Sequence, residues 1–223
     1  MVVASPVNIQ LGAGTKPLRG FVNLDLRDLP GTIRGHAHYI PVEAGTVDVL
    51  FSHAVFEHLF LVQQGMAVEE WERVLTPDGV AVCIGIPNFE AVARAYLDQA
   101  PGITRPTFDL LEAYRYTHGL PEAYQDDACD WQTWSPAEHP DAAPRGWLPQ
   151  LHKAIFDPSS IVEFCGVACG LKVTVISYCY PGEALPLALG FVAGHRVHDP
   201  IEALCRVPGV ETYIDFDTLE VTS

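Results

Sequence analysis

The sequence predicts an α/β fold built on a mostly parallel sheet with helices on both faces. Short runs rich in Val, Ile, Leu and Phe alternate with segments of helical periodicity, and such alternation favours right-handed crossovers between parallel strands. The first apolar run leads directly into the pair Gly12 and Gly14, an arrangement typical of a ligand-binding turn after a strand. No Ser/Gly-rich or charged linker divides the 223 residues, so we expect one domain over residues 1–223.

The N-terminal half contains the clearest elements. Strands are predicted where a short apolar run is bounded by Gly, Pro, Asp or Ser, at 7–11, 21–26, 47–51, 80–86 and, more weakly, 36–40. Apolar residues recur at helical spacing around Trp71 and around Val92, which predicts helices before and after the 80–86 strand. The stretch Thr76-Pro77-Asp78-Gly79 should end the first helix and turn into that strand.

The C-terminal part begins with a strong helix signal. Asp157-Pro158 is typical of an N-cap followed by proline at the first helical position, and Gly170 should end this helix. Two strands follow at 171–180 and 185–193, and the link between them is too short for a parallel crossover, so we expect an antiparallel pair. The segment after Val197 either adds an edge strand or contacts a partner subunit.

The segment 101–150 has no clean period and is rich in proline, aromatic residues and acids. Long irregular insertions in compact domains are commonly functional, so a lid over the substrate is one interpretation. Packing of its tryptophans in the core, or a homodimer contact, explains the composition nearly as well. Solvated loop acids are far commoner than metal ligands, so we predict no metal from the candidate set Asp126, Asp127, Asp130 and His139.

Composition limits the classes of partner. The chain has 28 acids against 13 Lys and Arg, a net charge of −15, and no basic stripe, so we expect no nucleic-acid partner. No apolar run is long enough to span a membrane, and the N-terminus lacks the features of a secretion signal. The six cysteines contain no C-x-x-C pair. Reduced core thiols and a cytoplasmic location are therefore expected.

The glycine loop and Asp25 together predict a nucleoside site. Gly12 and Gly14 allow a ligand to approach bare backbone, and Asp25 ends the next strand at the same edge of the sheet. A carboxylate there can accept both hydroxyls of a ribose. NAD is disfavoured, because Pro17 occupies the third glycine position of the dinucleotide fingerprint and Asp25 follows too soon.

An ordered set of motifs extends over most of the chain. It comprises Leu11–Gly14, Gly20–Asp25, Ile40-Pro41, Gly45–His53, Val55–Leu59, Glu72–Gly79, Ile86–Asn88, and His152-Lys153 with Phe156. In these motifs the chain resembles the class I S-adenosylmethionine-dependent methyltransferases, specifically the compact bacterial type 11 branch. The resemblance implies a Rossmann-like fold with a seven-stranded sheet whose last strand is antiparallel. It also implies S-adenosyl-L-methionine as the cofactor.

The resemblance also assigns cofactor-binding roles. Gly12, Ala13 and Gly14 would line the methionine and ribose, Asp25 would bind the ribose hydroxyls, and Leu26 would pack on the adenine. Two positions depart from the family pattern: Gln10 replaces the usual acid before the glycine loop, and His36 replaces an Asp often found after the third strand. Gln10 can still hydrogen-bond through its carbonyl. With His36 in place of the Asp, the resemblance assigns no side-chain contact to the adenine amino group, and Ala37 would contact the adenine through its backbone only.

Histidines provide the candidate catalytic groups. His53 ends the fourth strand, where it would contact the cofactor and act either as a general base or as a structural hydrogen-bonding group. His152 either faces the substrate or caps nearby backbone. Glu57 and His58 would mainly fix their loop and contact the cofactor.

The leading hypothesis is methyl transfer to the oxygen or nitrogen of a small-molecule acceptor. The resemblance points toward natural-product or glycan-type substrates. The alternative is a non-catalytic S-adenosylmethionine-binding protein that acts as a partner or sensor, favoured by the altered Gln10 and His36. An NAD-dependent enzyme is the third candidate.

Overall fold

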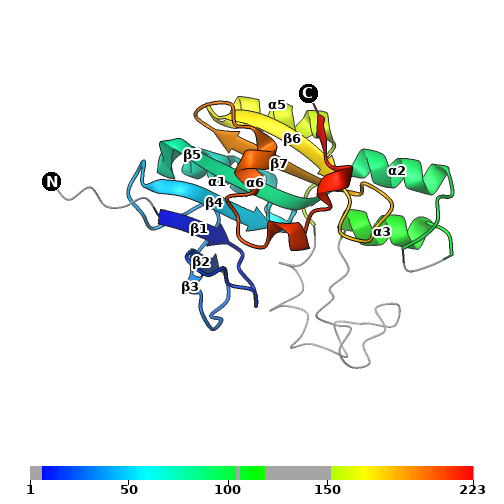
Figure 1. Cartoon of the computed structure of the whole chain (residues 1–223), viewed down its shortest axis with the longest axis horizontal. Coiled ribbons are helices and arrows are strands. Elements are labelled where there is room, and N and C mark those ends of the chain that lie inside the picture. Colours follow the sequence, from blue (N-terminus) through cyan, green and yellow to red (C-terminus); the bar gives the residue numbers. More distant parts are fainter. Residues whose placement is uncertain (1–6, 104–105, 119–151, 223) are drawn as a thin grey trace.

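The computed structural model describes residues 7–103, 106–118 and 152–222 and contains an eight-stranded sheet (Figure 1). The strand order is β3-β2-β1-β4-β5-β7-β6-β8. The strands are β1 (Val7–Leu11), β2 (Val22–Asp25), β3 (Ile33–Arg34), β4 (Val47–His53), β5 (Leu75–Pro87), β6 (Lys172–Tyr178), β7 (Ala188–Gly194) and β8 (Glu220–Thr222). The helices are η1 (Phe56–His58), α1 (Leu61–Val74), α2 (Phe89–Leu97), α3 (Leu110–His118), α5 (Pro158–Ala168), α6 (Pro200–Leu204), η4 (Val210–Thr212) and η5 (Phe216–Thr218).

The sheet is parallel from β3 through β5 and antiparallel beyond it. Strands β1 to β5 pair in parallel, whereas β7 pairs antiparallel with both β5 and β6. The predicted mostly parallel sheet with an antiparallel last pair is therefore confirmed. Because the carboxyl ends of β1, β2 and β4 meet at one edge, the loops that follow them lie together there.

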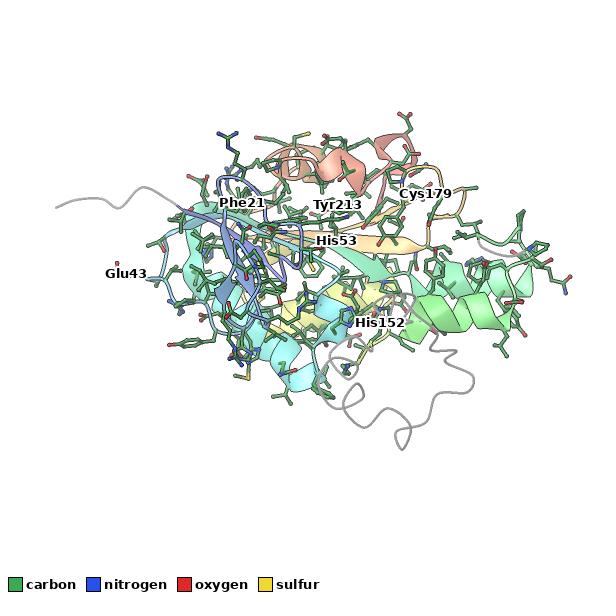
Figure 2. All side chains as sticks on the ribbon, turned by 90° about the horizontal axis from the view of Figure 1, so that it is seen from below. Phe21, Glu43, His53, His152, Cys179 and Tyr213 are labelled. Carbon is green, nitrogen blue, oxygen red and sulfur yellow. The ribbon has the colours of Figure 1, made fainter. Side chains whose placement is uncertain are left out.

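Alternate residues of the central strands face opposite sides of the sheet. In β4, Leu50 belongs to one apolar cluster, whereas Val49 and Phe51 belong to the other. Helices α1 and α5 cover the first face, and α6 with η4 and η5 covers the second. Figure 2 shows the sheet between these two layers. The prediction of helices on both faces is confirmed.

The strand predicted at 36–40 is wrong. The third strand is β3, at Ile33–Arg34, and the predicted segment is a turn closed by the antiparallel bridge between His36 and Tyr39. Alternating apolar residues suggested a strand, but Ile40 is buried for another reason. Its N–H donates to Glu70 Oε1 at 2.7 Å, and its side chain joins the core beneath α1. Tertiary contacts with a helix therefore decide this segment's conformation.

The stretch Thr76-Pro77-Asp78-Gly79 does not separate helix from strand as a free turn. Helix α1 ends at Val74 and β5 begins at once, with Leu75 opposite Val47 and Val80 opposite Val49. More residues lie between these pairs on β5 than on β4, so the stretch is a bulge within the ladder.

The segment after Val197 adds an edge strand, one of the two alternatives. Asp199 caps α6 by accepting from the Glu202 N–H at 2.9 Å, and β8 pairs antiparallel with β6. The sheet thus has eight strands rather than seven.

Part of the segment predicted to be irregular is helical. Helix α3 is capped by Asp109, whose Oδ1 accepts from the Glu112 N–H at 3.1 Å, and the Phe108 side chain before it packs against Val92 and Ala95 of α2. The Asp109–Glu112 spacing is a helix-start signal that the missing apolar period obscured. The rest of that prediction, including the lid and the acids at 126, 127 and 130, lies outside the described residues. Within the described ranges, no helix is long and apolar enough to cross a membrane.

Candidate cofactor site and histidine clusters

The glycine loop follows β1 at the carboxyl edge of the sheet. Gly12 and Gly14 have φ values of 61° and 56°, a left-handed conformation that residues with a Cβ adopt at a cost. At Gly12 a Cβ would also overlap the Val55 Cγ2 atom, which follows β4. The loop therefore needs glycine both for its backbone conformation and for its close approach to the neighbouring strand end.

Asp25 ends β2 beside this loop and is only 5% exposed. Its Oδ2 accepts from the Gly14 N–H at 2.8 Å, and its Oδ1 accepts from the Arg27 N–H at 2.9 Å and from Arg27 Nε at 3.0 Å. Burial alone would raise the pKa of Asp25, but the hydrogen bonds from Arg27 and Gly14 and the charge of Arg27 hold it below its usual value. The carboxylate is therefore ionised at neutral pH and fixed toward the glycine loop.

Gln10 holds the loop in place through its side-chain amide. Its Oε1 accepts from the Leu18 N–H at 2.8 Å, and its Nε2 donates to the Lys16 carbonyl at 3.2 Å. Asn23 on β2 also accepts from the Leu18 N–H, at 3.0 Å. The side-chain amide of Gln10 thus donates one hydrogen bond and accepts another in the stretch after Gly14. An ionised carboxylate at this position only accepts, so it could not make both bonds.

The predicted adenine-side residues lie at the ends of β2 and β3. Leu26 directly follows Asp25 and is 49% exposed, so an apolar surface is open beside the carboxylate. His36 is exposed in the turn after β3. The carbonyl of Ala37 accepts from Trp71 Nε1 at 2.9 Å, so Ala37 ties this turn to α1.

The end of β4 contains a feature with no sequence signal. Ala54 has a φ of 52°, an uncommon conformation for a residue with a side chain, and its N–H donates to the Ile84 carbonyl at 2.9 Å. Backbone strain of this kind concentrates at functional sites. A Cβ at the adjacent Gly85 would lie 2.8 Å from the Ala54 nitrogen, so this corner is closely packed.

His53 precedes Ala54 and packs under the C-terminal segment. Its ring centroid lies 4.3 Å from that of Tyr213 and 6.3 Å from that of Tyr180, and Figure 2 shows His53 close to Tyr213. The Nε2 atom is buried and has no hydrogen-bond partner among the residues that the structure describes. Burial, with a smaller contribution from the charge of Lys16, lowers the pKa of His53 to about 4. His53 is therefore neutral at pH 7.

His152 belongs to a second cluster, with Glu57 and His58 of η1. The His152 and His58 rings are 4.8 Å apart at their centroids, and His58 Nε2 lies 3.6 Å from Glu57 Oε1. Glu57 is 1% exposed, and burial raises its pKa to about 8. The structure thus separates the two predicted catalytic histidines, which appear apart in Figure 2.

Four further residues complete this edge of the sheet: Lys16, Arg27, Ala54 and Tyr213. Lys16 and Arg27 are cations close in sequence to Gly14 and Asp25, and this proximity is only a weak indication that they belong to the site. Tyr213 approaches His53 from far along the chain, and its ring centroid is 5.8 Å from Lys16 Nζ. No local pattern predicts that contact.

Comparisons with known proteins concern a domain and the fold. Residues 16–83 match the model of a family described as a methyltransferase domain. A SAM-dependent methyltransferase structure from Methanosarcina mazei aligns with a TM-score of 0.51 and 11% identity, covering 87% of this chain and 94% of the other. A protein structure from Pyrococcus horikoshii OT3 aligns with a TM-score of 0.50 and 11% identity, covering 87% and 84%. No curated protein matches this chain.

The aligned structures establish the fold, and the sequence match begins just after the glycine loop and extends through β2, β3 and β4 into β5. The matched region thus contains Asp25 and the end of β4. Residues 16–83 are thus similar to a methyltransferase domain, and the chain shares its fold with a SAM-dependent methyltransferase from Methanosarcina mazei.

Proposed function

We propose that this protein is an S-adenosylmethionine-dependent methyltransferase that transfers a methyl group to the oxygen or nitrogen of a small-molecule acceptor. The observation that carries the cofactor half of this proposal is the buried Asp25 carboxylate, which the Gly14 N–H and Arg27 fix beside two left-handed glycines. Such a carboxylate, at the carboxyl ends of parallel strands, suits the hydroxyls of a ribose.

The residues at this edge fit S-adenosylmethionine. Gly12, Ala13 and Gly14 would line its methionine and ribose, since they present backbone where a side chain would block approach. Exposed Leu26 offers an apolar surface for the adenine, with His36 and Ala37 at the end of the neighbouring strand. When bound, the cofactor supplies a methyl group already activated on a sulfonium. The protein's own task is then to orient the acceptor and exclude water.

His53 is better suited to scaffolding than to general-base catalysis. A general base works best when its pKa lies near the operating pH, and that of His53 is about 4. Its buried Nε2 is also covered by the aromatic contact with Tyr213. We assign His53 the role of holding the end of β4 against the C-terminal segment, and His152 remains the candidate to face the acceptor.

The acceptor class is supported by charge. A chain with a net charge of −15 suits neutral or cationic small molecules better than phosphate backbones. Natural-product and glycan-type acceptors remain the substrates we propose, together with a cytoplasmic location. The location is supported by the cysteines in the described ranges, which are all free thiols. The segment 101–150 remains a proposed substrate lid or homodimer contact.

Calorimetric titration with S-adenosylmethionine and S-adenosylhomocysteine tests the cofactor site. We expect binding by the wild type and by the control Asp28→Ala, whose exposed carboxylate lies in the next turn of the chain. Asp25→Ala should bind at least about tenfold more weakly, because hydrogen bonds to a charged group contribute about 1.5–3 kcal/mol. Equal affinity of Asp25→Ala and wild type would contradict the site.

Screening acceptors for release of S-adenosylhomocysteine tests the transfer. Turnover with a hydroxyl- or amine-bearing small molecule would support the proposal. A protein that binds the cofactor tightly and consumes none with any acceptor would instead favour a partner or sensor role, the alternative that the altered Gln10 and His36 suggested.

A further inference from the structure

Two segments far apart in the sequence meet beside η1. The Lys153 N–H donates to the Glu57 carbonyl at 2.6 Å, and a bridge between Asn88 and Phe156 holds the same segment against the end of β5. These backbone contacts place His152 next to Glu57 and His58. The juxtaposition is built by main-chain bonds rather than by flexible surface side chains.

The three side chains present metal-ligating atoms to one point. One atom each from Glu57, His58 and His152 lies within 4.8 Å of the other two. The Glu57 Oε1 to His58 Nε2 distance of 3.6 Å is long for a hydrogen bond. Two ligands on one tetrahedral zinc ion, each about 2.0–2.1 Å from the metal, would be about 3.3–3.4 Å apart. The Glu57–His58 pair would therefore need to contract by a few tenths of an ångström to share a cation, and the widest separation in the triad, up to 4.8 Å, by up to about 1.4 Å.

The burial of Glu57 is a second, independent observation. Its Oε2 atom is also buried and, within residues 7–103, 106–118 and 152–222, has no hydrogen-bond partner. An isolated buried carboxylate is costly, and proteins ordinarily pair it with a cation or a metal. Lys153 does not direct its ammonium there, since Nζ lies over the Phe60 ring, 5.7 Å from its centroid.

The orientation of His152 fits a ligand role. Its Nδ1 lies 3.3 Å from the Thr117 carbonyl, and a carbonyl requires that this nitrogen carry the proton. The lone pair is then on Nε2. Metal-bound histidines are commonly held by such a bond from the other ring nitrogen to a backbone carbonyl.

We propose that Glu57, His58 and His152 bind a divalent transition-metal ion of the zinc type. Two imidazoles and one carboxylate suit Zn²⁺, Fe²⁺ or Co²⁺, whereas Mg²⁺ and Ca²⁺ prefer all-oxygen sites. Three protein ligands leave a coordination position for water or for an oxygen of the acceptor. Coordination of an acceptor oxygen rests on the proposed function, whereas metal binding itself does not.

The test uses the full chain without a histidine tag, treated with a chelator and dialysed. Cys205→Ser is the common background, because Cys205 is an exposed thiol that would itself bind zinc. Zn²⁺ is titrated by calorimetry and Co²⁺ by visible absorption, with Mg²⁺ as the negative control. We expect one equivalent of Zn²⁺ or Co²⁺ per chain, a raised Tm on binding, and no effect of Mg²⁺.

Variants identify the ligands. His58→Gln and His152→Gln should each weaken Zn²⁺ binding at least tenfold, and so should Glu57→Gln, whereas the control His195→Gln, at an exposed histidine, should bind as the background does. His152 is only half-buried, so its variant tests the site even if Glu57→Gln fails to fold. The proposal is overturned if the background protein binds no Zn²⁺, or if His58→Gln and His152→Gln retain its affinity. Cofactor titration of the same samples separates this outcome from failure of the proposed function.

Discussion

Acid should destabilise this protein through His53 in particular. In the folded state the imidazole lies among Tyr180, Tyr213 and the backbone of Gly85, with Lys16 as the neighbouring positive charge. Protonation would bury a second cation there. The unfolded chain imposes no such cost, so it takes up the proton first as the pH falls.

The size of the effect follows from the pKa difference. His53 has a pKa of about 4 in the folded protein against 6.5 for an unperturbed histidine. Because the pKa is lower in the folded protein, the contribution of neutral His53 to stability is fully present above pH 6.5. It is lost as the pH falls from 6.5 to about 4, and no further loss occurs below that range. At about 1.36 kcal/mol per unit, the full loss is at most about 3 kcal/mol. Between pH 7.0 and 5.5 it is about 1 kcal/mol by the same linkage.

Urea unfolding at pH 7.0 and 5.5, on wild type and His53→Phe, measures this loss. Phenylalanine keeps the aromatic contact with Tyr213 but does not titrate. Other titrating groups, including Glu57 and His198, act on both proteins, so the difference between them isolates His53. Lys16→Met should raise the pKa of His53 and shrink the loss. If wild type and His53→Phe lose the same stability over this range, the reasoning about this buried imidazole is refuted.

Three further predictions concern stability, each measured by urea unfolding against a matched control. Gly12→Ala should destabilise by about 1–2 kcal/mol because of its left-handed φ, whereas Gly65→Ala, in open space on α1, should stabilise by up to about 1 kcal/mol; equal effects would contradict this. Ile214→Ala should cost about 2–5 kcal/mol and Val221→Ala, on the exposed edge, well under 1; a mild Ile214→Ala would mean that the C-terminal segment is not core. Asp157→Ala should cost about 1 kcal/mol as a lost N-cap, and no loss would contradict the capping role.

Local signals in the sequence predicted the elements that local physics determines. The strand at 7–11 matched β1, and Asp157-Pro158 marked the start of α5, because apolar runs and capping residues act within a few residues of themselves. The turn at 36–40 was missed because its conformation depends on Trp71 and Glu70 from α1. Short-range alternation contains no information about such partners.

In the candidate site too, the sequence predicted contacts between residues close in the chain and missed contacts between distant ones. Asp25 was identified because it lies one strand away from the glycine loop, and the structure joins the two by a single hydrogen bond. The contact of His53 with Tyr213, and that of His58 with His152, join positions far apart in the chain. Only the folded topology brings those pairs together, so the residue types alone could not indicate a neutral histidine under a tyrosine or the proposed metal triad.

The C-terminal segment that covers one face of the sheet has a consequence for synthesis. Val49, Phe51 and Val82 emerge from the ribosome well before Ala203, Val210 and Ile214, the residues that cover them. During that interval the nascent chain presents an uncovered apolar sheet face, a surface prone to association. Chains truncated before Pro200 should therefore aggregate rather than yield a smaller folded domain, and cells that produce this protein would need to shield that face until translation passes residue 214.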